Sequence, residues 1–177
     1  MNSVADAKTL FSHHRDGVFR YLSRIVGQPD TADELTQEVF LRAWRGPVAG
    51  DTEVERRAWV FKVARNLALN HLRDASRRPQ MVELTEATQP ATQETSAALR
   101  QALAALPDLE RDVFLMRETV GLSYGEIAAA CDVTVDAVRA RLHRARVQLR
   151  EALGRQVADR RACGVRIGRR QPGGSDD

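Results

Sequence analysis

Five arginines and one histidine lie between residues 133 and 150, a segment well equipped to bind an anion. Guanidinium groups bind phosphates and, through paired hydrogen bonds, the edges of guanine bases. The alternative is a solvated helix, which usually pairs its cations with acids four residues away. Asp136 is the only acid in the segment, and it has no basic residue at that spacing. The composition therefore favours contact with nucleic acid.

A helical projection of this segment separates an apolar stripe from the charged side. The stripe consists of Val135, Val138, Leu142, Ala145 and Leu149. On the other side, the small residues Ala137 and Ala140 lie between arginines. A helix with this surface can approach the floor of a major groove, so we expect it to be the helix that reads DNA.

Residues 123–149 fit a helix-turn-helix unit. Ser123 and Glu126 have the spacing of a capping box, in which each side chain accepts a hydrogen bond from the other's backbone N–H. Asp132 stands at the turn, where aspartate tolerates a left-handed backbone, and Thr134 can cap the second helix. Many helical hairpins share this pattern, so the DNA interpretation depends on the arginines of the second helix.

A second basic segment lies at residues 59–78. Its cations and amides recur at helical spacing, which predicts one polar face made of Lys62, Arg65, Asn66, Asn70 and Arg73. Cations bind phosphates and amides bind base edges, so this mixture suits nucleic acid, with a solvated helix as a close alternative. Trp59, at its start, is either a core anchor or a platform on which a base stacks.

The charge of the chain is unevenly distributed. It carries 27 basic and 24 acidic side chains, for a net charge of +3. Residues 56–78 hold seven basic residues against one acid and residues 134–155 hold six against two, whereas residues 79–133 are acidic. Two basic blocks separated by acidic sequence predict two contact surfaces for a polyanion.

Residues 31–44 predict a different kind of surface. Thr31 and Glu34 have capping-box spacing, so a helix should begin there. Its polar face has no basic excess and consists of Asp33, Glu34, Gln37, Glu38 and Arg42. This face is either solvated or a docking surface for another protein, and not a surface for DNA.

Composition argues against several classes of protein. The sequence contains no run of eighteen apolar residues, the length that could cross a membrane. Its first residues also lack a basic-then-apolar leader, so we expect a cytoplasmic protein. Cys131 and Cys163 have no partner at metal-ligand spacing. We therefore expect Cys131 to be a small core residue and Cys163 to be an exposed thiol in the tail. Histidines and carboxylates are scattered, which predicts no metal, no cofactor and no small-molecule substrate.

Helical periodicity predicts an all-α chain of two small helical domains joined by a flexible linker. The first domain covers residues 5–78. The linker covers residues 79–96, which are polar and lack aromatic side chains. The second domain, with the helix-turn-helix, covers residues 97–154, and residues 155–177 are expected to form a disordered basic tail.

Three motifs, in this order, resemble those of the extracytoplasmic-function (ECF) group of the bacterial sigma-70 family of RNA polymerase sigma factors. Asp33-Glu-Leu-Thr-Gln-Glu-Val-Phe-Leu-Arg-Ala-Trp44 is similar to the group's polymerase-binding helix, and Trp59-Val-Phe-Lys-Val-Ala-Arg-Asn66 to its helix for the −10 element. Gly121-Leu-Ser-Tyr-Gly-Glu-Ile-Ala128 with Val138-Arg-Ala-Arg-Leu-His-Arg-Ala-Arg146 is similar to its helix-turn-helix for the −35 element. The resemblance covers about residues 10–153.

The resemblance implies a non-catalytic protein that binds the RNA polymerase core and directs it to promoters. The residues implied at the clamp of the largest subunit are Asp33, Glu34, Leu35, Gln37, Glu38 and Leu41. Those implied at the −10 element, beside a loop at 45–57 that captures a flipped base, are Trp59, Lys62, Arg65, Asn66, Asn70 and Arg73. Those implied at the −35 element are Ser123, Tyr124, Thr134, Val135, Asp136, Arg139, Ala140, Arg141, His143 and Arg144. The flap of the second-largest subunit and an anti-sigma factor are further implied partners.

The residues alone leave three other classes open. A helix-turn-helix repressor or response-type regulator would need neither the polar face at 31–44 nor the second basic helix. A small nuclease would need a cluster of carboxylates or histidines at metal spacing, which the sequence lacks. A helical scaffold would use its arginines only for solubility. Binding to the RNA polymerase core separates the sigma-factor hypothesis from all three.

Overall fold

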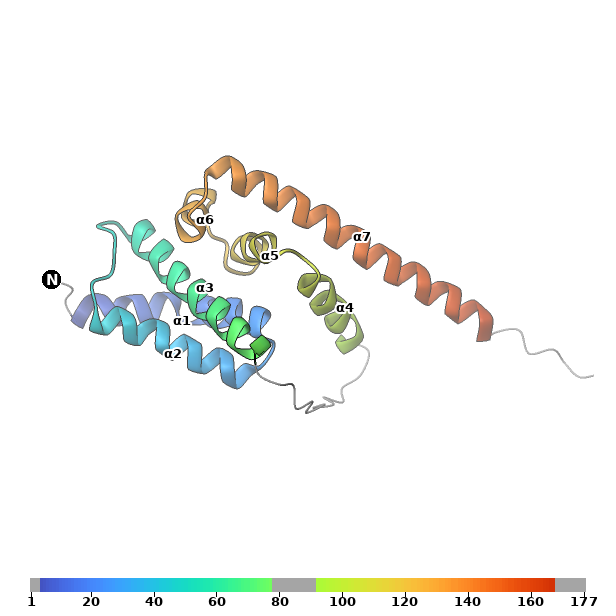
Figure 1. Cartoon of the computed structure of the whole chain (residues 1–177), viewed down its shortest axis with the longest axis horizontal. Helices are drawn as coiled ribbons and strands as arrows, with labels where there is room; N and C mark the ends of the chain where they lie inside the picture. Colours follow the sequence, from blue (N-terminus) through green and yellow to red (C-terminus); the bar gives the residue numbers. More distant parts are fainter. Residues whose placement is uncertain (1–3, 78–91, 168–177) are drawn as a thin grey trace, which may run out of the picture.

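The computed structural model describes residues 4–77 and 92–167, and describes side chains for residues 7–77 and 97–155. Every regular element in these ranges is helical, which confirms the all-α prediction (Figure 1). Most of the expected linker lies outside the described residues, and residues 92–96 already belong to a helix.

The N-terminal half is a bundle of three helices: α1 (Val4–Val26), α2 (Pro29–Arg45) and α3 (Glu53–Arg77). Each packs against the other two. Completely buried side chains fill the space between them, among them Val18, Leu22, Val39, Val60 and Phe61. Burial of these apolar groups is the main driving force that holds the bundle together.

Helix α2 begins earlier than its sequence predicts. It starts at Pro29, because proline in the first turn already has a helical φ and needs no N–H partner there. The Thr31 hydroxyl instead donates to Gln28 Oε1 at 3.1 Å. The capping box predicted for Thr31 and Glu34 is therefore wrong.

Helix α3 also begins before the predicted start at Trp59. Thr52 and Glu55 form the box that opens it: the Glu55 N–H donates to Thr52 Oγ1 at 3.2 Å, and the Thr52 N–H donates to Glu55 Oε2 at 3.0 Å. The Asp51 N–H donates to the same carboxylate oxygen at 2.9 Å, so Glu55 fixes the loop ahead of the helix as well. The Thr-x-x-Glu spacing of Thr52 and Glu55 is visible in the sequence and would have predicted the start of α3.

The C-terminal half consists of α4 (Thr92–Ala104), α5 (Asp108–Leu115), a π-helical turn η1 (Met116–Val120), α6 (Tyr124–Cys131) and α7 (Val135–Ile167). Residues 155–167 continue α7, where a disordered tail was expected. Arginine and alanine, both good helix formers, recur through this stretch, with one glycine before residue 168. The remainder of that tail lies outside the described residues.

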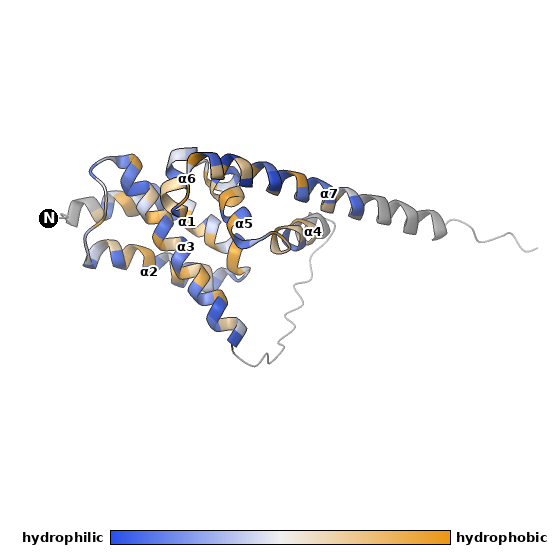
Figure 2. Ribbon diagram, turned by 45° about the horizontal axis from the view of Figure 1, so that its top comes forward, coloured by the Kyte–Doolittle hydropathy of each residue, from blue (hydrophilic) through white to orange (hydrophobic). Residues whose placement is uncertain are grey.

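The two halves pack directly against each other. α3 lies beside α6 (Figures 1 and 2), and α1 also contacts η1. Buried apolar side chains from both halves form one contiguous core, in which Tyr21 and Phe61 meet edge to face at 6.0 Å. Met116 and Ile127 contribute to that core from the C-terminal half, both fully buried. Sequence patterns within each helix did not reveal this contact between distant segments.

Candidate nucleic-acid interface

The local geometry of the helix-turn-helix matches its sequence prediction. The Glu126 N–H donates to Ser123 Oγ at 3.2 Å, and the Ser123 N–H donates to Glu126 Oε2 at 2.7 Å, which completes the capping box. Asp132 has the expected left-handed backbone, with φ 55° and ψ 48°. The Thr134 hydroxyl accepts the Ala137 N–H at 3.1 Å and so caps α7. These contacts fix the angle at which α6 leads into α7.

The first turns of α7 present a polar surface. The predicted apolar stripe is buried from Val138 onward, whereas Val135 is exposed on the outer side. The exposed predicted residues on and next to this helix are Thr134, Val135, Asp136, Arg139, Ala140, His143 and Arg144. Ser123 is also exposed, whereas Tyr124 is half-buried, with the Arg117 guanidinium 5.2 Å above its ring.

The arginines of α7 have acidic partners that the sequence analysis missed. Glu110 of α5 is buried and accepts hydrogen bonds from Arg141 and Arg144, each at 3.1 Å. Glu118 of η1 pairs with Arg146 at 2.6 Å. The sequence has no acids four residues away from these arginines along α7, and their absence favoured contact with nucleic acid; the partners come instead from neighbouring elements, a relation that helical periodicity does not reveal.

Arg139 is paired within its own helix. Its guanidinium lies 2.8 Å from the Asp136 carboxylate, three residues earlier, and both side chains are largely exposed. An exposed pair of this kind contributes at most about 1 kcal/mol, so Arg139 can leave Asp136 readily for a stronger partner. Among the arginines predicted at the −35 element, Arg139 is therefore the one most available for an external ligand.

The predicted polar face of α3 divides into two parts. Asn66, Asn70 and Arg73 are exposed. Lys62 and Arg65 contact the C-terminal half instead: Lys62 Nζ lies 2.6 Å from Asp132 Oδ1, and Arg65 Nε donates to Asp112 Oδ2 at 2.7 Å.

Trp59 is half-buried against the core and also faces a hollow of about 310 Å³. The residues around this hollow come from the loop before α3, from α3 and from α6: Ala49, Gly50, Glu55, Ala58, Trp59, Lys62 and Ala129. Gly50 has a φ of +112°, and an added Cβ would come within 2.4 Å of the Glu55 side chain, so this loop requires glycine. Both roles considered for Trp59, as core anchor and as stacking platform, fit this position.

Asp112 is the centre of a buried polar cluster between the two halves. Its side chain is 1% exposed and accepts hydrogen bonds from the Tyr21 hydroxyl at 3.0 Å and from Arg65 at 2.7 Å. Burial raises the pKa of the Asp112 carboxyl, while Arg65 and Tyr21 stabilise its charged form and oppose that rise. Nearby Cys131 is a buried core residue as predicted, and burial raises the pKa of its thiol to about 12.

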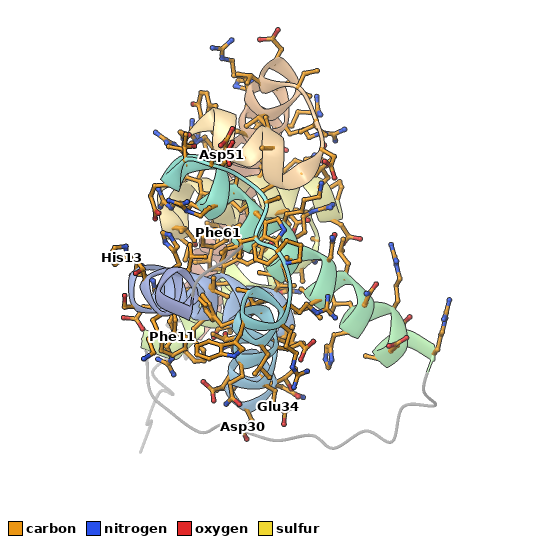
Figure 3. All side chains as sticks on the ribbon, turned by 90° about the vertical axis from the view of Figure 1, so that its left-hand side faces the viewer. Phe11, His13, Asp30, Glu34, Asp51 and Phe61 are labelled. Carbon is orange, nitrogen blue, oxygen red and sulfur yellow. The ribbon has the colours of Figure 1, made fainter. Side chains whose placement is uncertain are left out.

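An apolar groove lies beside the predicted docking face of α2. Phe11, Leu41 and Trp44 remain 44%, 43% and 54% exposed. The groove has a volume of about 540 Å³ and is lined by Ala7, Lys8, Phe11, Gln37, Phe40, Leu41 and Trp44. Phe11 lies at the margin of the bundle, whereas Phe61 lies inside it (Figure 3). Helical spacing alone groups Phe11 and Trp44 with the apolar residues of their helices and does not identify them as surface groups.

The remaining predicted docking residues lie on the same helix, α2. Glu34 is exposed and Leu35 is partly buried against the core. Asp33 accepts hydrogen bonds from Arg15 at 3.2 Å and from Gln37 at 2.8 Å. Glu38 pairs with Arg42 at 2.9 Å. The surface thus combines an apolar groove with acidic and amide side chains.

Within the described parts of the chain, we find no group of three or more histidine, cysteine or acidic side chains placed to hold a metal ion. Nor does any helix in these parts have the length and apolar character needed to span a bilayer.

Two family models match separate parts of the chain. Sigma-70 region 2 matches residues 10–78, and Sigma-70, region 4 matches residues 96–149. The chain is 34% identical over 155 residues to the ECF RNA polymerase sigma factor SigL of Mycobacterium tuberculosis, a match that covers 82% of this chain and 88% of SigL. It is 31% identical over 161 residues to the ECF sigma factor SigE of Mycolicibacterium smegmatis, covering 85% of this chain and 62% of SigE.

Two solved structures share the fold. CnrH, in complex with the cytosolic domain of CnrY, has a TM-score of 0.66 at 22% identity, covering 86% of this chain and 90% of CnrH. The sigma factor RpoE of Bartonella quintana, in complex with the anti-sigma factor NepR, has a TM-score of 0.63 at 21% identity, covering 85% of this chain and 98% of RpoE. With region 2 in the N-terminal half, region 4 in the C-terminal half and SigL matched over most of its length, this chain belongs to the ECF group of sigma-70 RNA polymerase sigma factors.

Proposed function

We propose that this chain binds the RNA polymerase core in the cytoplasm and directs it to promoters without catalysing a reaction itself. The observation that carries the proposal is the exposed start of α7, in which Arg139, His143 and Arg144 flank the small Ala140 on a properly capped helix-turn-helix. This surface has the shape and charge to enter the major groove of a −35 element. Region 2 then supplies the second DNA contact.

The −10 contact is assigned to α3 and the loop before it. The exposed Asn66, Asn70 and Arg73 support it, because amides read base edges and arginine binds phosphate. The hollow beside Trp59 and Lys62 provides an aromatic ring and a cation next to a rigid loop, which suits a base flipped out of the opened strand.

The polymerase contact is assigned to α2 and its apolar groove. Aromatic side chains are typical anchors of protein interfaces, and Trp44 and Phe11 both line this groove. The proposed partner is the clamp of the largest subunit, with region 4 contacting the flap of the second-largest subunit. Because RpoE is bound by the anti-sigma factor NepR, we also assign an anti-sigma factor as a partner of this chain.

Co-purification with RNA polymerase core tests this function directly. We expect the purified chain to form a complex with core enzyme on size exclusion and to confer initiation at specific promoters. Failure to bind core would overturn the proposal and favour a helix-turn-helix regulator.

Arg139→Ala is expected to reduce initiation at promoters that depend on the −35 element by about five- to 150-fold. The reason is that one bidentate arginine–base contact contributes about 1–3 kcal/mol of discrimination. Arg150→Ala removes the same charge from an exposed position farther along α7 and is the matched control. Core affinity, measured by fluorescence anisotropy, should be unchanged in both variants; an equal loss of core binding in Arg139→Ala would contradict the assignment.

Glu110→Gln is expected to lower discrimination between −35 sequences without lowering total DNA affinity. The buried carboxylate holds Arg141 and Arg144 in fixed positions, and its neutralisation releases charge that non-specific phosphates can bind. The slope of log affinity against log salt should steepen by about 0.9 for each additional phosphate contacted. Glu118→Gln, which frees Arg146 at an exposed pair, is the control and should leave discrimination intact.

A further inference from the structure

Asp136 puts a negative charge on the surface of α7 that the proposed function assigns to the −35 element. It is the only acid between residues 133 and 150, and it belongs to the first turn of the helix. At about 100° per residue it lies opposite the buried Val138, Leu142 and Ala145, so it faces away from the core. Phosphates on both sides of a major groove repel a carboxylate there, so Asp136 lowers the affinity for DNA unless a base compensates.

The ion pair between Asp136 and Arg139 differs from the pairs that Glu110 makes with Arg141 and Arg144. The Glu110 side chain is 9% exposed, so only its two arginines are accessible to an external ligand. The Asp136 side chain is 89% exposed, and Arg139 Nη1 lies 2.8 Å from its Oδ1. Both members of this pair are therefore accessible to DNA.

The pair leaves hydrogen-bonding groups free on both side chains. In the parts of the chain that the structure describes, the only hydrogen bond of either side chain runs from Arg139 Nη1 to Asp136 Oδ1. Arg139 Nε and Nη2 can still donate side by side to guanine O6 and N7, and Asp136 Oδ2 can accept from one further donor. Because Asp136 holds the guanidinium, Arg139 also loses less rotamer freedom when it binds a base.

The edges of the bases determine which of them Asp136 can accept. In the major groove, cytosine presents the N4 amino group, adenine presents an N6 amino group beside the acceptor N7, and guanine and thymine present acceptors. An acceptor repels a carboxylate, so Asp136 Oδ2 fits cytosine best. Three residues advance about 4.5 Å along a helix, close to the spacing of about 3.4 Å between base pairs. Asp136 and Arg139 can therefore reach neighbouring base pairs.

We propose that Asp136 determines specificity in the upstream DNA contact: it accepts a hydrogen bond from cytosine N4 and holds Arg139 for a guanine in the neighbouring base pair. The −35 element of this chain thus contains one guanine and one cytosine in adjacent pairs, read by the two members of one ion pair. At other sequences the carboxylate meets acceptors and phosphates without a donor, and binding weakens. This inference rests on the proposed assignment of α7 to the −35 element.

The test changes the hydrogen-bonding groups of Asp136 in the full chain bound to core polymerase. Asp136→Asn keeps the size of the side chain and gives it an amide, which pairs with adenine N6 and N7. Asp136→Ala removes every hydrogen-bonding group. Glu151→Gln, the control, removes one negative charge from an exposed position farther along α7. Each polymerase selects promoters from a library with a randomised upstream box, and the selected bases are counted at every position.

Wild type and Glu151→Gln should both select a cytosine next to a guanine. Asp136→Asn should replace that cytosine with adenine and change the ratio of the two bases on the order of tenfold, the effect of one mismatched base pair. Asp136→Ala should accept all four bases there, and its preference for the guanine should weaken because Arg139 is no longer held. It should also bind random duplex more tightly than Glu151→Gln, since the charge that faces the phosphates is gone.

Two results would overturn the inference. Both Asp136 variants could select the same bases as wild type; with a lowered melting temperature, this would show that Asp136 only stabilises the first turn of α7. Alternatively, wild type could select guanine or thymine at the position that the Asp136 variants change. Failure of the proposed function gives a different result, because wild type would then select no upstream box with core polymerase, or Arg139→Ala would leave that box unchanged.

Discussion

Phe61→Ala is expected to lower the free energy of unfolding by about 3–5 kcal/mol, the usual loss when a buried phenylalanine is truncated and leaves a cavity. Phe61 is completely buried, meets Tyr21 edge to face and lies close to Gly17 of α1. The cavity would therefore open where α1, α3 and the region 4 contact converge. Urea denaturation followed by circular dichroism measures the change.

Phe11→Ala is the matched control, because it makes the same substitution at a side chain that is 44% exposed. It should cost far less stability, since much of that ring already contacts water. If the two variants lose equal stability, the placement of α3 in the core is wrong.

Trp44→Ala is expected to weaken binding to the polymerase core by roughly thirtyfold, which corresponds to about 2 kcal/mol for an interface hot spot. Trp44 is 54% exposed and lines the α2 groove, so its truncation should leave the unfolding free energy nearly unchanged. Leu41→Ala, on the same groove, should weaken core binding in the same direction and by less, because leucine buries a smaller surface. The complex that the variant does form with core polymerase should keep its promoter preference.

Val54→Ala is the control for this surface, as Val54 is 58% exposed but lies at the start of α3, away from the groove. Core affinity measured by fluorescence anisotropy should match wild type. If Trp44→Ala binds core with wild-type affinity, the polymerase contact does not lie at this groove.

The parts of the site that the sequence predicted are those determined by neighbours along the chain. The capping box at Ser123 and the left-handed Asp132 depend on interactions within four residues, so residue types alone predict them. The buried stripe of α7 follows from helical periodicity in the same way. At α2, proline at the first turn took precedence over a capping box, and both signals were visible in the sequence.

The parts that the sequence did not predict depend on which helices meet. Nothing in the sequence indicated that Asp112 pairs with Arg65, which lies in the other region. Nor did the sequence indicate that Glu110 binds two arginines of α7. Likewise, the apolar residues of α1 and α2 could not be sorted into core and groove, because Phe11 and Phe40 both follow helical spacing and only one of them is buried. Contacts of this kind are set by tertiary packing.

We propose that this chain reads two separate promoter elements with two separate helices. Run-off transcription with core polymerase on a library of random promoters tests it most directly, comparing wild type with Arg139→Ala and Asn70→Ala. Wild type should select two sequence boxes; Arg139→Ala should relax only the upstream box, and Asn70→Ala only the downstream box. Selection of a single box by wild type, or loss of both boxes in either variant, would contradict the claim.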